Sequence, residues 1–401
     1  MSEYVRRIKR PEKAVASRLG SLDIELTERC NNNCIHCCIN LPADNHEVKE
    51  REMTTSQVKA ILAEAAALGW QHVRFTGGEP LLRSDFEELY LFARRLGLKV
   101  LIFTNARLIT PHLADLLARI PPLMTIEVTA YGMHAESYEE VSRVPGSYQQ
   151  FRRGVDLLLE HRVPFIIKAA LLPPNRHEID EFEAWAQTIP WMHEAPNYSM
   201  FFDLRNRRDD RMKNRLIASL RISPEEGLAV LTRDREKYRK EMKEFATKFM
   251  GPPGDLLFRC GAGQGLCIDA YGHAQPCMGV RTPELTVDVI GAYSSDSLGA
   301  KAQGFSLQDA LTRFSVGLGH NRPLSELRAA HPEYLYRCAK CFLKGLCEQC
   351  PSKSWAEHGT LDTPVEYLCK VAHAQACWIG WLRADEKAWM VLDWKARIRH
   401  S

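Results

Sequence analysis

The stretch Cys30-Asn-Asn-Asn-Cys34-Ile-His-Cys37 directly follows a short apolar run, Leu22–Leu26, which has the composition of a buried strand. Three thiolates with this spacing on one loop can hold three corners of a cubane iron–sulfur cluster, and the fourth iron then has no protein ligand. A structural zinc site is the alternative interpretation, because His36 or Cys38 would complete the four closed ligands that zinc prefers. The loop alone does not decide between these two sites.

A second motif, Phe75-Thr-Gly-Gly-Glu-Pro80, ends the next predicted strand. Paired glycines leave backbone amides and carbonyls open to a ligand that approaches closely, and Glu79 adds a fixed negative charge. A glycine pair by itself usually makes only a turn. One strand–helix unit after a three-cysteine loop, the motif indicates a ligand site and favours the cluster over zinc.

Short apolar runs rich in Val, Ile, Phe and Thr alternate with amphipathic segments from residue 21 to about residue 205. The six runs are Leu22–Leu26, His72–Thr76, Lys99–Thr104, Met124–Thr129, Pro164–Leu172 and Tyr198–Phe202. This alternation predicts an α/β fold whose parallel strands are joined by right-handed crossovers. An open doubly wound sheet and a curved partial barrel both fit it, and in either one the chemistry belongs at the carboxyl ends of the strands.

Local signals predict where several helices begin and end. Three capping boxes are expected, formed by Thr54 with Gln57, by Ser84 with Glu87, and by Ser147 with Gln150. Gly69 is the expected stop of the first of these helices. Ser223-Pro-Glu-Glu226 begins a further helix inside a highly charged segment.

Composition excludes several classes of protein. The 53 Lys and Arg residues against 50 Asp and Glu give a net charge of only +3, so no nucleic-acid partner is expected. The polar N-terminus lacks the apolar core of a secretory signal, and no run reaches the roughly 18 apolar residues of a membrane span. We therefore expect a cytoplasmic protein whose 13 cysteines are metal ligands or catalysts rather than disulfides.

The three-cysteine loop, the Gly77-Gly-Glu-Pro80 motif and the six strand–helix units together resemble the radical S-adenosylmethionine (SAM) superfamily, over roughly residues 20–205. The resemblance implies a partial (β/α)6 barrel in which Cys30, Cys34 and Cys37 hold a [4Fe–4S] cluster. In that family the open iron chelates the amine and carboxylate of SAM. One electron from the reduced cluster then cleaves the C–S bond, and the resulting 5′-deoxyadenosyl radical abstracts hydrogen from a substrate.

The resemblance also implies residues that bind SAM. The glycine motif would lie beside the methionine amine, and three residues after later strands would contact ribose or carboxylate. His36 stands where the family usually has a larger aromatic residue, and its ring is expected to pack against adenine. The implied residues are Gly77, Gly78, Glu79, Pro80, Asn105, Thr129, Arg143 and His36.

Nine more cysteines follow Phe258, and most of them form an ordered pattern. The order is Cys260, Cys267, Gly272-x4-Cys277, Cys338-x2-Cys341-x5-Cys347-x2-Cys350 and Cys369. A zinc ribbon built on the two close pairs would leave Cys260, Cys277 and Cys369 without partners. The order instead resembles the SPASM extension, a cysteine-rich domain of radical enzymes that modify peptides.

That resemblance implies two auxiliary [4Fe–4S] clusters. The first would be held by Cys260, Cys267, Cys277 and Cys350, and the second by Cys338, Cys341, Cys347 and Cys369. Two departures are visible, because the last spacing has two residues where three are usual and Cys267 lies where the pattern is loose. The first cluster could therefore have three protein ligands and an iron open to substrate. Cys38 and Cys377 are interpreted as buried thiols.

Four regions follow: an N-terminal extension (1–20), the radical SAM core (21–205), a charged helical connector (206–255) and a SPASM domain (256–401). The predicted function is hydrogen abstraction from a peptide or protein side chain, that is, an oxidoreductase acting as a peptide maturase. Oxidation of a small metabolite is the alternative within enzymes, and a non-catalytic iron–sulfur electron carrier is the alternative outside them. The catalytic residues, the substrate, the reaction outcome and the oligomeric state are not predicted.

The expected partners are a peptide or protein substrate and an electron donor such as flavodoxin or ferredoxin. About 20 residues precede the first strand, which is too few for a fused winged helix that binds a leader peptide. A peptide substrate is therefore expected either to dock on the barrel directly or to use a separate leader-peptide recognition protein.

Overall fold

The computed structural model describes residues 21–194, 196–199, 211–250, 254–293, 306–316, 323–347 and 350–400. The chain divides into two compact units, residues 1–199 with 261–319 and residues 200–260 with 320–401. The predicted N-terminal extension, residues 1–20, and parts of the predicted connector lie outside the described residues. The predicted borders near residues 20, 205 and 255 stay predictions.

Six parallel strands form the centre of the first unit. They are β1 (Ser21–Thr27), β4 (His72–Gly77), β5 (Lys99–Thr104), β6 (Leu123–Ala130), β7 (Ile166–Ala170) and β8 (Asn197–Ser199). They lie side by side in chain order and every neighbouring pair is parallel. A doubly wound sheet would reverse its strand order at a switch point, so the fold is a partial (β/α)6 barrel. The six predicted strands are confirmed, with β7 shorter than expected and residues 200–202 of the last one outside the described residues.

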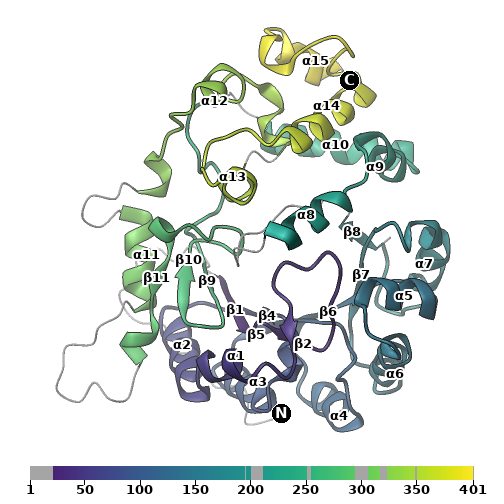
Figure 1. The fold of residues 1–401 in the computed structure, drawn as a ribbon, viewed down its shortest axis with the longest axis vertical. Coiled ribbons are helices and arrows are strands. Elements are labelled where there is room, and N and C mark those ends of the chain that lie inside the picture. Colours follow the sequence, from purple (N-terminus) through teal and green to yellow (C-terminus); the bar gives the residue numbers. More distant parts are fainter. Residues whose placement is uncertain are drawn as a thin grey trace. The chain divides into compact units, whose positions relative to one another are not determined.

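Helices follow the strands along the chain and lie outside them in Figure 1. They are α2 (Thr55–Ala67), α3 (Phe86–Arg95), α4 (Pro111–Arg119), α5 (Ala135–Ser142), α6 (Ser147–Glu160) and α7 (Ile179–Ala186). The short elements β2 (Arg29–Cys30), β3 (Leu41–Pro42) and α1 (His46–Arg51) lie between β1 and α2.

The other edge of β1 is also paired. Strand β9 (Leu266–Ile268) runs parallel to β1, and β10 (His273–Gln275) and β11 (Val287–Asp288) extend the sheet in antiparallel order. Gly272 has φ +84° at the turn between β9 and β10, a conformation that favours glycine. The segment Gly272-x4-Cys277 therefore belongs to a hairpin that completes a nine-stranded sheet (Figure 1). Helix α11 (Leu307–Val316) belongs to the same unit.

Side chains alternate along β1 as expected for a strand. Leu22, Ile24 and Leu26 are fully buried on one face, and Asp23, Glu25 and Thr27 lie on the other. The register pairs Asp23 with Arg74 of β4, so the second face continues across the sheet as a polar face. The polar face is the interior side of the barrel, because the helices lie outside the strands (Figure 1).

The structure confirms some predicted helix ends and corrects others. Thr54 and Ser223 both form capping boxes, and Gly69 (φ +81°) follows the C-cap of α2. The box predicted at Ser84 is wrong, because Asp85 precedes α3 and its carboxylate is bound by Arg83 and Thr55 instead of capping the helix. The box predicted at Ser147 is also wrong.

Helix α6 begins one residue earlier than that box requires. Gly146, with φ +76°, is its N-cap, and Ser147 is the first helical residue. The Ser147 hydroxyl is bonded to the Ser142 hydroxyl at 2.7 Å, so it joins α6 to the end of α5.

The second unit is helical in its described part. It contains α8 (Arg211–Ser219), α9 (Pro224–Leu231), α10 (Arg235–Phe249), α12 (Pro332–Tyr336), α13 (Pro351–His358), α14 (Glu366–Ile379) and α15 (Trp394–His400). Its apolar core joins α10, α14 and the segment around Phe342 and Trp381. This cysteine-rich unit therefore has a hydrophobic core of its own. None of the helices in the described ranges is long and apolar enough to cross a membrane.

Candidate cluster and cofactor site

The three-cysteine loop is fixed at both ends. Strand β2, which contains Cys30, pairs with β3 and closes the loop. Two backbone amides of the loop, those of Asn33 and Ile35, donate to the carbonyls of Ser142 and Val141 at the end of α5, at 2.9 and 3.0 Å. The loop is thus held against the barrel at the carboxyl end of β1.

The thiols of this loop are shielded from solvent. Cys34 is buried, and Cys30 and Cys37 are half-buried. Burial raises the pKa of Cys34 to about 12 and that of Cys30 well above its ordinary value. Because a metal-bound sulfur must be deprotonated, loading this site with iron would displace protons that the thiols otherwise hold firmly.

Close contacts with the backbone of Thr27 and Arg29 require glycine at positions 77 and 78. The Gly78 amide donates to the Thr27 carbonyl at 2.6 Å, and the Glu79 amide donates to the Arg29 carbonyl at 2.9 Å. A Cβ atom on Gly78 would lie 2.2 Å from the Arg29 carbonyl oxygen. Gly77 has φ +124°, and a Cβ atom on it would lie 2.2 Å from the Thr27 carbonyl oxygen. The interpretation that these amides are left open to a ligand is therefore corrected, since the chain leading to the cysteine loop occupies them.

Glu79 is a buried carboxylate at the carboxyl end of β4. It accepts hydrogen bonds from the Thr104 hydroxyl and the Asn105 amide, both at 2.8 Å, and from the Leu81 amide at 3.1 Å. Burial raises its pKa to about 7, and these three hydrogen bonds oppose the rise. The three hydrogen bonds thus hold the carboxylate in place, and its pKa lies close to neutral pH.

Asn105 brings the predicted residues together. Its side-chain Nδ2 donates to Asn31 Oδ1 at 2.8 Å and lies 3.8 Å from Cys30 Sγ. Its backbone amide is the donor to Glu79. The ends of β1, β4 and β5 therefore meet around Cys30, Glu79 and Asn105, as the sequence predicted for the carboxyl ends of parallel strands.

Arg107 is a site residue that sequence reasoning missed. Its guanidinium donates to the Asn31 carbonyl and to Asn32 Oδ1, and its Nε donates to Gln150 at 3.0 Å. It lies two residues after Asn105, in the loop that follows β5. That position was the available signal, because polar residues after a parallel strand point to the site.

Buried and half-buried aromatic rings lie beside the cysteines. The rings of His36 and Tyr131 are 5.6 Å apart, and those of Tyr131 and Tyr138 are 5.4 Å apart. Burial, followed by the neighbouring Cys34 thiol, raises the pKa of Tyr138 well above its ordinary value. Among the described residues, the Tyr138 hydroxyl and Asn32 Nδ2 have no hydrogen-bond partner. Buried donors normally have acceptors, so a sulfur-rich group held by the three thiols fits this site.

The remaining predicted SAM-binding residues are near the site but have no described contact with the cysteines. Pro80 is buried at the start of the 3₁₀-helix η1 (Pro80–Leu82). Thr129 is half-buried on β6, opposite Lys168 of β7. Arg143 is exposed after α5, with φ 56°, next to the Ser142 carbonyl that holds the cysteine loop. Their contacts with SAM stay predictions.

The polar face holds ion pairs that the sequence did not single out. Asp23 pairs with Arg74 at 3.2 Å, and Glu127 pairs with Lys168. Both cations lie over the Phe103 ring, at 5.0 and 5.5 Å from its centroid. The interior side of the barrel is therefore charged yet balanced, which suits a polar substrate.

The second predicted auxiliary set lies within the second unit. Burial raises the pKa of Cys338 and Cys341 to about 12, and the Cys369 thiol adds to both rises. Burial raises the pKa of Tyr334, and the charges of Cys338 and Cys347 add to this rise. The Cys338, Cys341 and Cys369 thiols thus influence one another, and the grouping of all four cysteines stays a prediction.

The first predicted auxiliary set draws on both units. Cys267 and Cys277 belong to the first unit, and Cys260 and Cys350 to the second. Cys267 is fully buried in β9, with its Sγ 3.5 Å from an Arg281 nitrogen that also pairs with Glu25 at 2.7 Å. Grouping these four residues stays a prediction. Cys38 and Cys377 are half-buried, so their interpretation as buried thiols is corrected.

No group of three or more His, Cys, Asp or Glu side chains within the described ranges could hold a metal ion. A cubane differs from a single ion, because its four thiolates bind separate irons and need not converge on one point.

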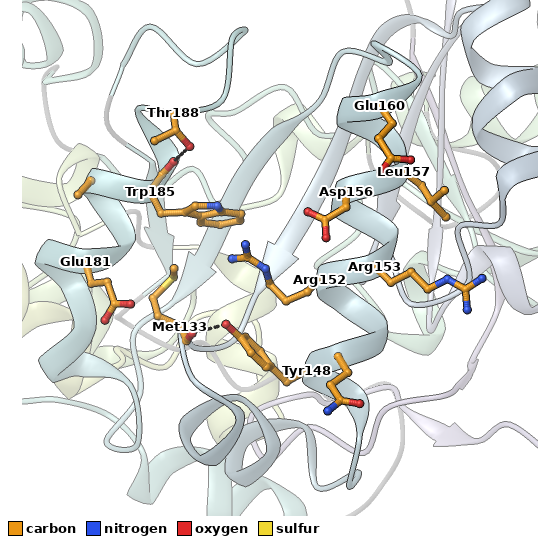
Figure 2. Close-up of a pocket in the computed structure, with 12 residues that line it drawn as sticks. Met133, Tyr148, Arg152, Arg153, Asp156, Leu157, Glu160, Glu181, Trp185 and Thr188 are labelled. Atoms are coloured by element: carbon orange, nitrogen blue, oxygen red, sulfur yellow. Dashed lines mark hydrogen bonds between the residues drawn. The ribbon is translucent and has the colours of Figure 1, made fainter.

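A further cavity lies apart from these residues. A groove of about 960 Å³ runs between α6 and α7, and none of the predicted site residues lines it. In Figure 2 the Arg152 guanidinium lies beside the Trp185 ring, 5.2 Å from its centroid, and the Tyr148 hydroxyl bonds the Met133 carbonyl. The groove is on the helical side of the barrel, away from the polar face.

Comparison with known proteins identifies the core. Residues 24–186 match the model of the Radical SAM superfamily, whose members use a [4Fe–4S] cluster and SAM. Two solved structures have a similar fold: anSMEcpe with bound AdoMet (TM-score 0.60, 15% identity, 89% of this chain and 95% of that one) and Streptococcus suis SuiB bound to S-adenosylmethionine (TM-score 0.54, 16% identity, 88% and 77%).

Curated relatives are similar over part of their length. The AdoMet-dependent heme synthase of Methanosarcina barkeri is 31% identical over 46% of this chain and 51% of its own length. The mycofactocin maturase MftC of Mycolicibacterium smegmatis is 30% identical over 63% and 62%. The chain spans about half or less of the first curated relatives that it matches. Residues 24–186, with the cysteine loop and the Gly77-Gly78-Glu79 turn at their strand ends, are thus the part of the chain that is similar to radical SAM domains.

Proposed function

We propose that this chain is a radical SAM enzyme that abstracts a hydrogen atom from a side chain of a peptide or protein and so acts as a peptide maturase. The observation that carries the proposal is the meeting of Cys30, Glu79 and Asn105 at three neighbouring strand ends. When bound there, a reduced [4Fe–4S] cluster and SAM supply the 5′-deoxyadenosyl radical that removes the hydrogen atom.

The chain's own residues have distinct tasks in this proposal. Cys30, Cys34 and Cys37 hold the cluster. Glu79, immobilised by Thr104 and Asn105, accepts a hydrogen bond from the methionine ammonium. Arg107 keeps the loop in place through Asn31 and Asn32. The ion-paired polar face orients the polar groups of the substrate.

The C-terminal cysteines support a peptide substrate over a small one. Their order resembles that of the SPASM extension, and the similarity to MftC, a maturase by name, covers 63% of this chain and so extends beyond the core. We propose two auxiliary clusters on the sets assigned above and an electron donor such as flavodoxin or ferredoxin. A separate recognition protein would present the peptide.

Oxidation of a small metabolite is the second candidate. It is favoured by the similarity of the core to AdoMet-dependent heme synthases, which covers 46% of this chain in the first case. A tetrapyrrole precursor is the corresponding substrate class.

Two assays test the proposal. Anaerobically reconstituted protein, given SAM and dithionite, should form 5′-deoxyadenosine, and Cys34→Ala should abolish this while other bound iron remains. No 5′-deoxyadenosine from the wild-type protein would contradict a radical SAM enzyme and favour the electron carrier.

The substrate class needs labelled substrates. Deuterium transfer into 5′-deoxyadenosine from a peptide encoded by a neighbouring reading frame would support the maturase. Transfer only from a deuterated iron porphyrin precursor would replace it with the second candidate.

A further inference from the structure

Arg337 is clamped at the edge of the second auxiliary set. Its guanidinium is bonded to Glu333 at 2.7 Å and to Glu366, and it lies 4.8 Å from the centroid of the Trp389 ring. One terminal nitrogen lies 3.4 Å from Cys369 Sγ. The side chain is only 13% exposed. The carboxylates and the ring therefore fix a cation against one cysteine of the set.

One N–H donor of this guanidinium has no described acceptor. Within the ranges that the structure describes, Arg337 Nε is buried and has no hydrogen-bond partner. Arg337 directly precedes Cys338 in the chain and bonds Cys369 from α14. A buried donor without an acceptor costs free energy, so this arrangement suits an acceptor lying among the cysteines.

Tyr334 supplies a second such donor. It is fully buried, and its hydroxyl likewise lacks a partner among the described residues. The Tyr334 carbonyl accepts a hydrogen bond at 2.8 Å from the amide of Ala339, which follows Cys338 in the chain. The Lys344 ammonium lies 4.9 Å from the centroid of the Tyr334 ring, and Cys347 Sγ lies 3.4 Å from the Lys344 carbonyl oxygen. Tyr334 is thus associated with Cys347, and Arg337 with Cys369.

We propose that Arg337 and Tyr334 are positioning residues that donate hydrogen bonds to the sulfur atoms of a cluster on Cys338, Cys341, Cys347 and Cys369 and so raise its reduction potential. This inference rests on the proposed function, which supplies the cluster. Reduction adds one electron and therefore one negative charge to the cluster. A cationic donor 3.4 Å from one thiolate stabilises the reduced form more than the oxidised form. The pair would make this cluster a ready acceptor of one electron.

The test is a redox titration with dithionite, followed by electron paramagnetic resonance. It uses the full chain with Cys30, Cys34 and Cys37 changed to alanine, so that only auxiliary clusters give signals. The signal lost in Cys338→Ala identifies the second cluster. Arg337→Met should weaken its electron affinity about tenfold, which is about 59 mV for a one-electron couple. Arg337→Lys and Tyr334→Phe should each lower the midpoint less.

A matched control is available in the same unit. Arg383 is also paired with a glutamate, Glu386 at 2.9 Å, but its side chain is 76% exposed and has no described contact with a cysteine. Arg383→Met should leave the midpoint potential unchanged.

The outcomes separate this inference from the proposed function. An unchanged midpoint in Arg337→Met at full iron content overturns the inference and leaves the cluster in place. Iron content showing no cluster on the Cys338 set overturns both. If Arg337→Met loses the cluster, the midpoint potentials of Arg337→Lys and Tyr334→Phe test the inference. A lower midpoint in these variants supports it, and unchanged midpoints in both overturn it.

Thermal stability gives a second readout for Tyr334. Tyr334→Phe should leave the melting temperature of the cluster-free chain unchanged or raise it, and should lower that of the loaded chain. An equal loss in both forms would show that the hydroxyl serves the protein alone, and would overturn its part of the inference.

Discussion

The Glu79 carboxylate accepts a hydrogen bond from the Asn105 backbone amide at 2.8 Å, which ties the end of β4 to the end of β5. The Asn105 side chain in turn bonds Asn31 of the cysteine loop at 2.8 Å. One buried carboxylate therefore links the ends of three parallel strands. A substitution at Glu79 should therefore affect both the binding of SAM and the position of the cysteine loop.

We expect Glu79→Gln to weaken SAM binding by about 1.5–3 kcal/mol, because a charge-assisted hydrogen bond to the methionine ammonium is lost. The amide would also turn a donor toward either the Asn105 amide or the Thr104 hydroxyl. Calorimetric titration of the reconstituted protein measures the affinity. Unchanged affinity would leave the Gly-Gly-Glu turn with a purely architectural role.

Glu79 should also make stability depend on pH. Burial raises its pKa from 4.5 to about 7, so the folded chain holds this proton more tightly than the unfolded chain. Its contribution to the free energy of unfolding is therefore greatest below pH 4.5 and is lost as the pH rises through about 7, by about 3 kcal/mol in total. Denaturant unfolding of the cluster-free wild type and Glu79→Gln at several pH values measures it. Parallel pH profiles would contradict the expectation.

Gly78→Ala should disrupt the anchoring of the cysteine loop. The new methyl group would lie 2.2 Å from the Arg29 carbonyl oxygen, and backbone on both sides must move. We expect a loss of more than about 2 kcal/mol in stability, together with loss of iron from the N-terminal site. The control is Gly69→Ala, which meets nothing within 4 Å but has φ +81°, and should cost about 1 kcal/mol without affecting iron. Equal effects would show that the close contact is unimportant.

Arg107→Met should loosen the cysteine loop, because two hydrogen bonds from a charged donor to Asn31 and Asn32 are removed. At about 1.5–3 kcal/mol for such a bond, we expect at least a tenfold faster loss of iron from the N-terminal site. Iron release followed by absorbance measures it. Arg119→Met removes only an exposed pair with Asp115 and should have no effect. Equal release rates in the two variants would contradict a role for Arg107.

The triple variant Cys338→Ala, Cys341→Ala, Cys347→Ala should fold, since Cys341 is the one of the three in the apolar core of the second unit and the larger members of that core are unchanged. We expect it to lose one cluster, to cleave SAM still, and to make no finished product. Iron content, 5′-deoxyadenosine and product are measured together. Finished product would rule out electron transfer through the second cluster, and insoluble protein would favour a structural role for it.

The strands were predictable because each is a short run of branched and aromatic residues between turn signals, as in Lys99–Thr104. The six strands also lie in the sheet in the same order as their runs in the sequence. The cap at Ser84 was not predictable, because Asp85 next to it competes for the same position and is then drawn to Arg83 and Thr55. Local pattern cannot show which partner wins.

The candidate site was predictable where residue type and strand position coincide, as for Cys30, Glu79 and Asn105. The use of Gly78 was misread, because the group that approaches it is the backbone of Arg29 in β2 and not a ligand. The donors Arg107 and Arg337 were missed since arginine is common on surfaces, and only tertiary contacts show that these two serve cysteine-bearing segments.

The pairing of β9 with β1 has a consequence for how the chain is made. A barrel cut open after six strands leaves the free edge of β1 exposed, and such edges promote aggregation. Here that edge is covered by Leu266–Ile268, which the ribosome adds more than 200 residues after Ser21–Thr27. The first unit must therefore wait, with one edge unprotected, until the hairpin emerges, and a chaperone or rapid cluster insertion would shorten that exposure.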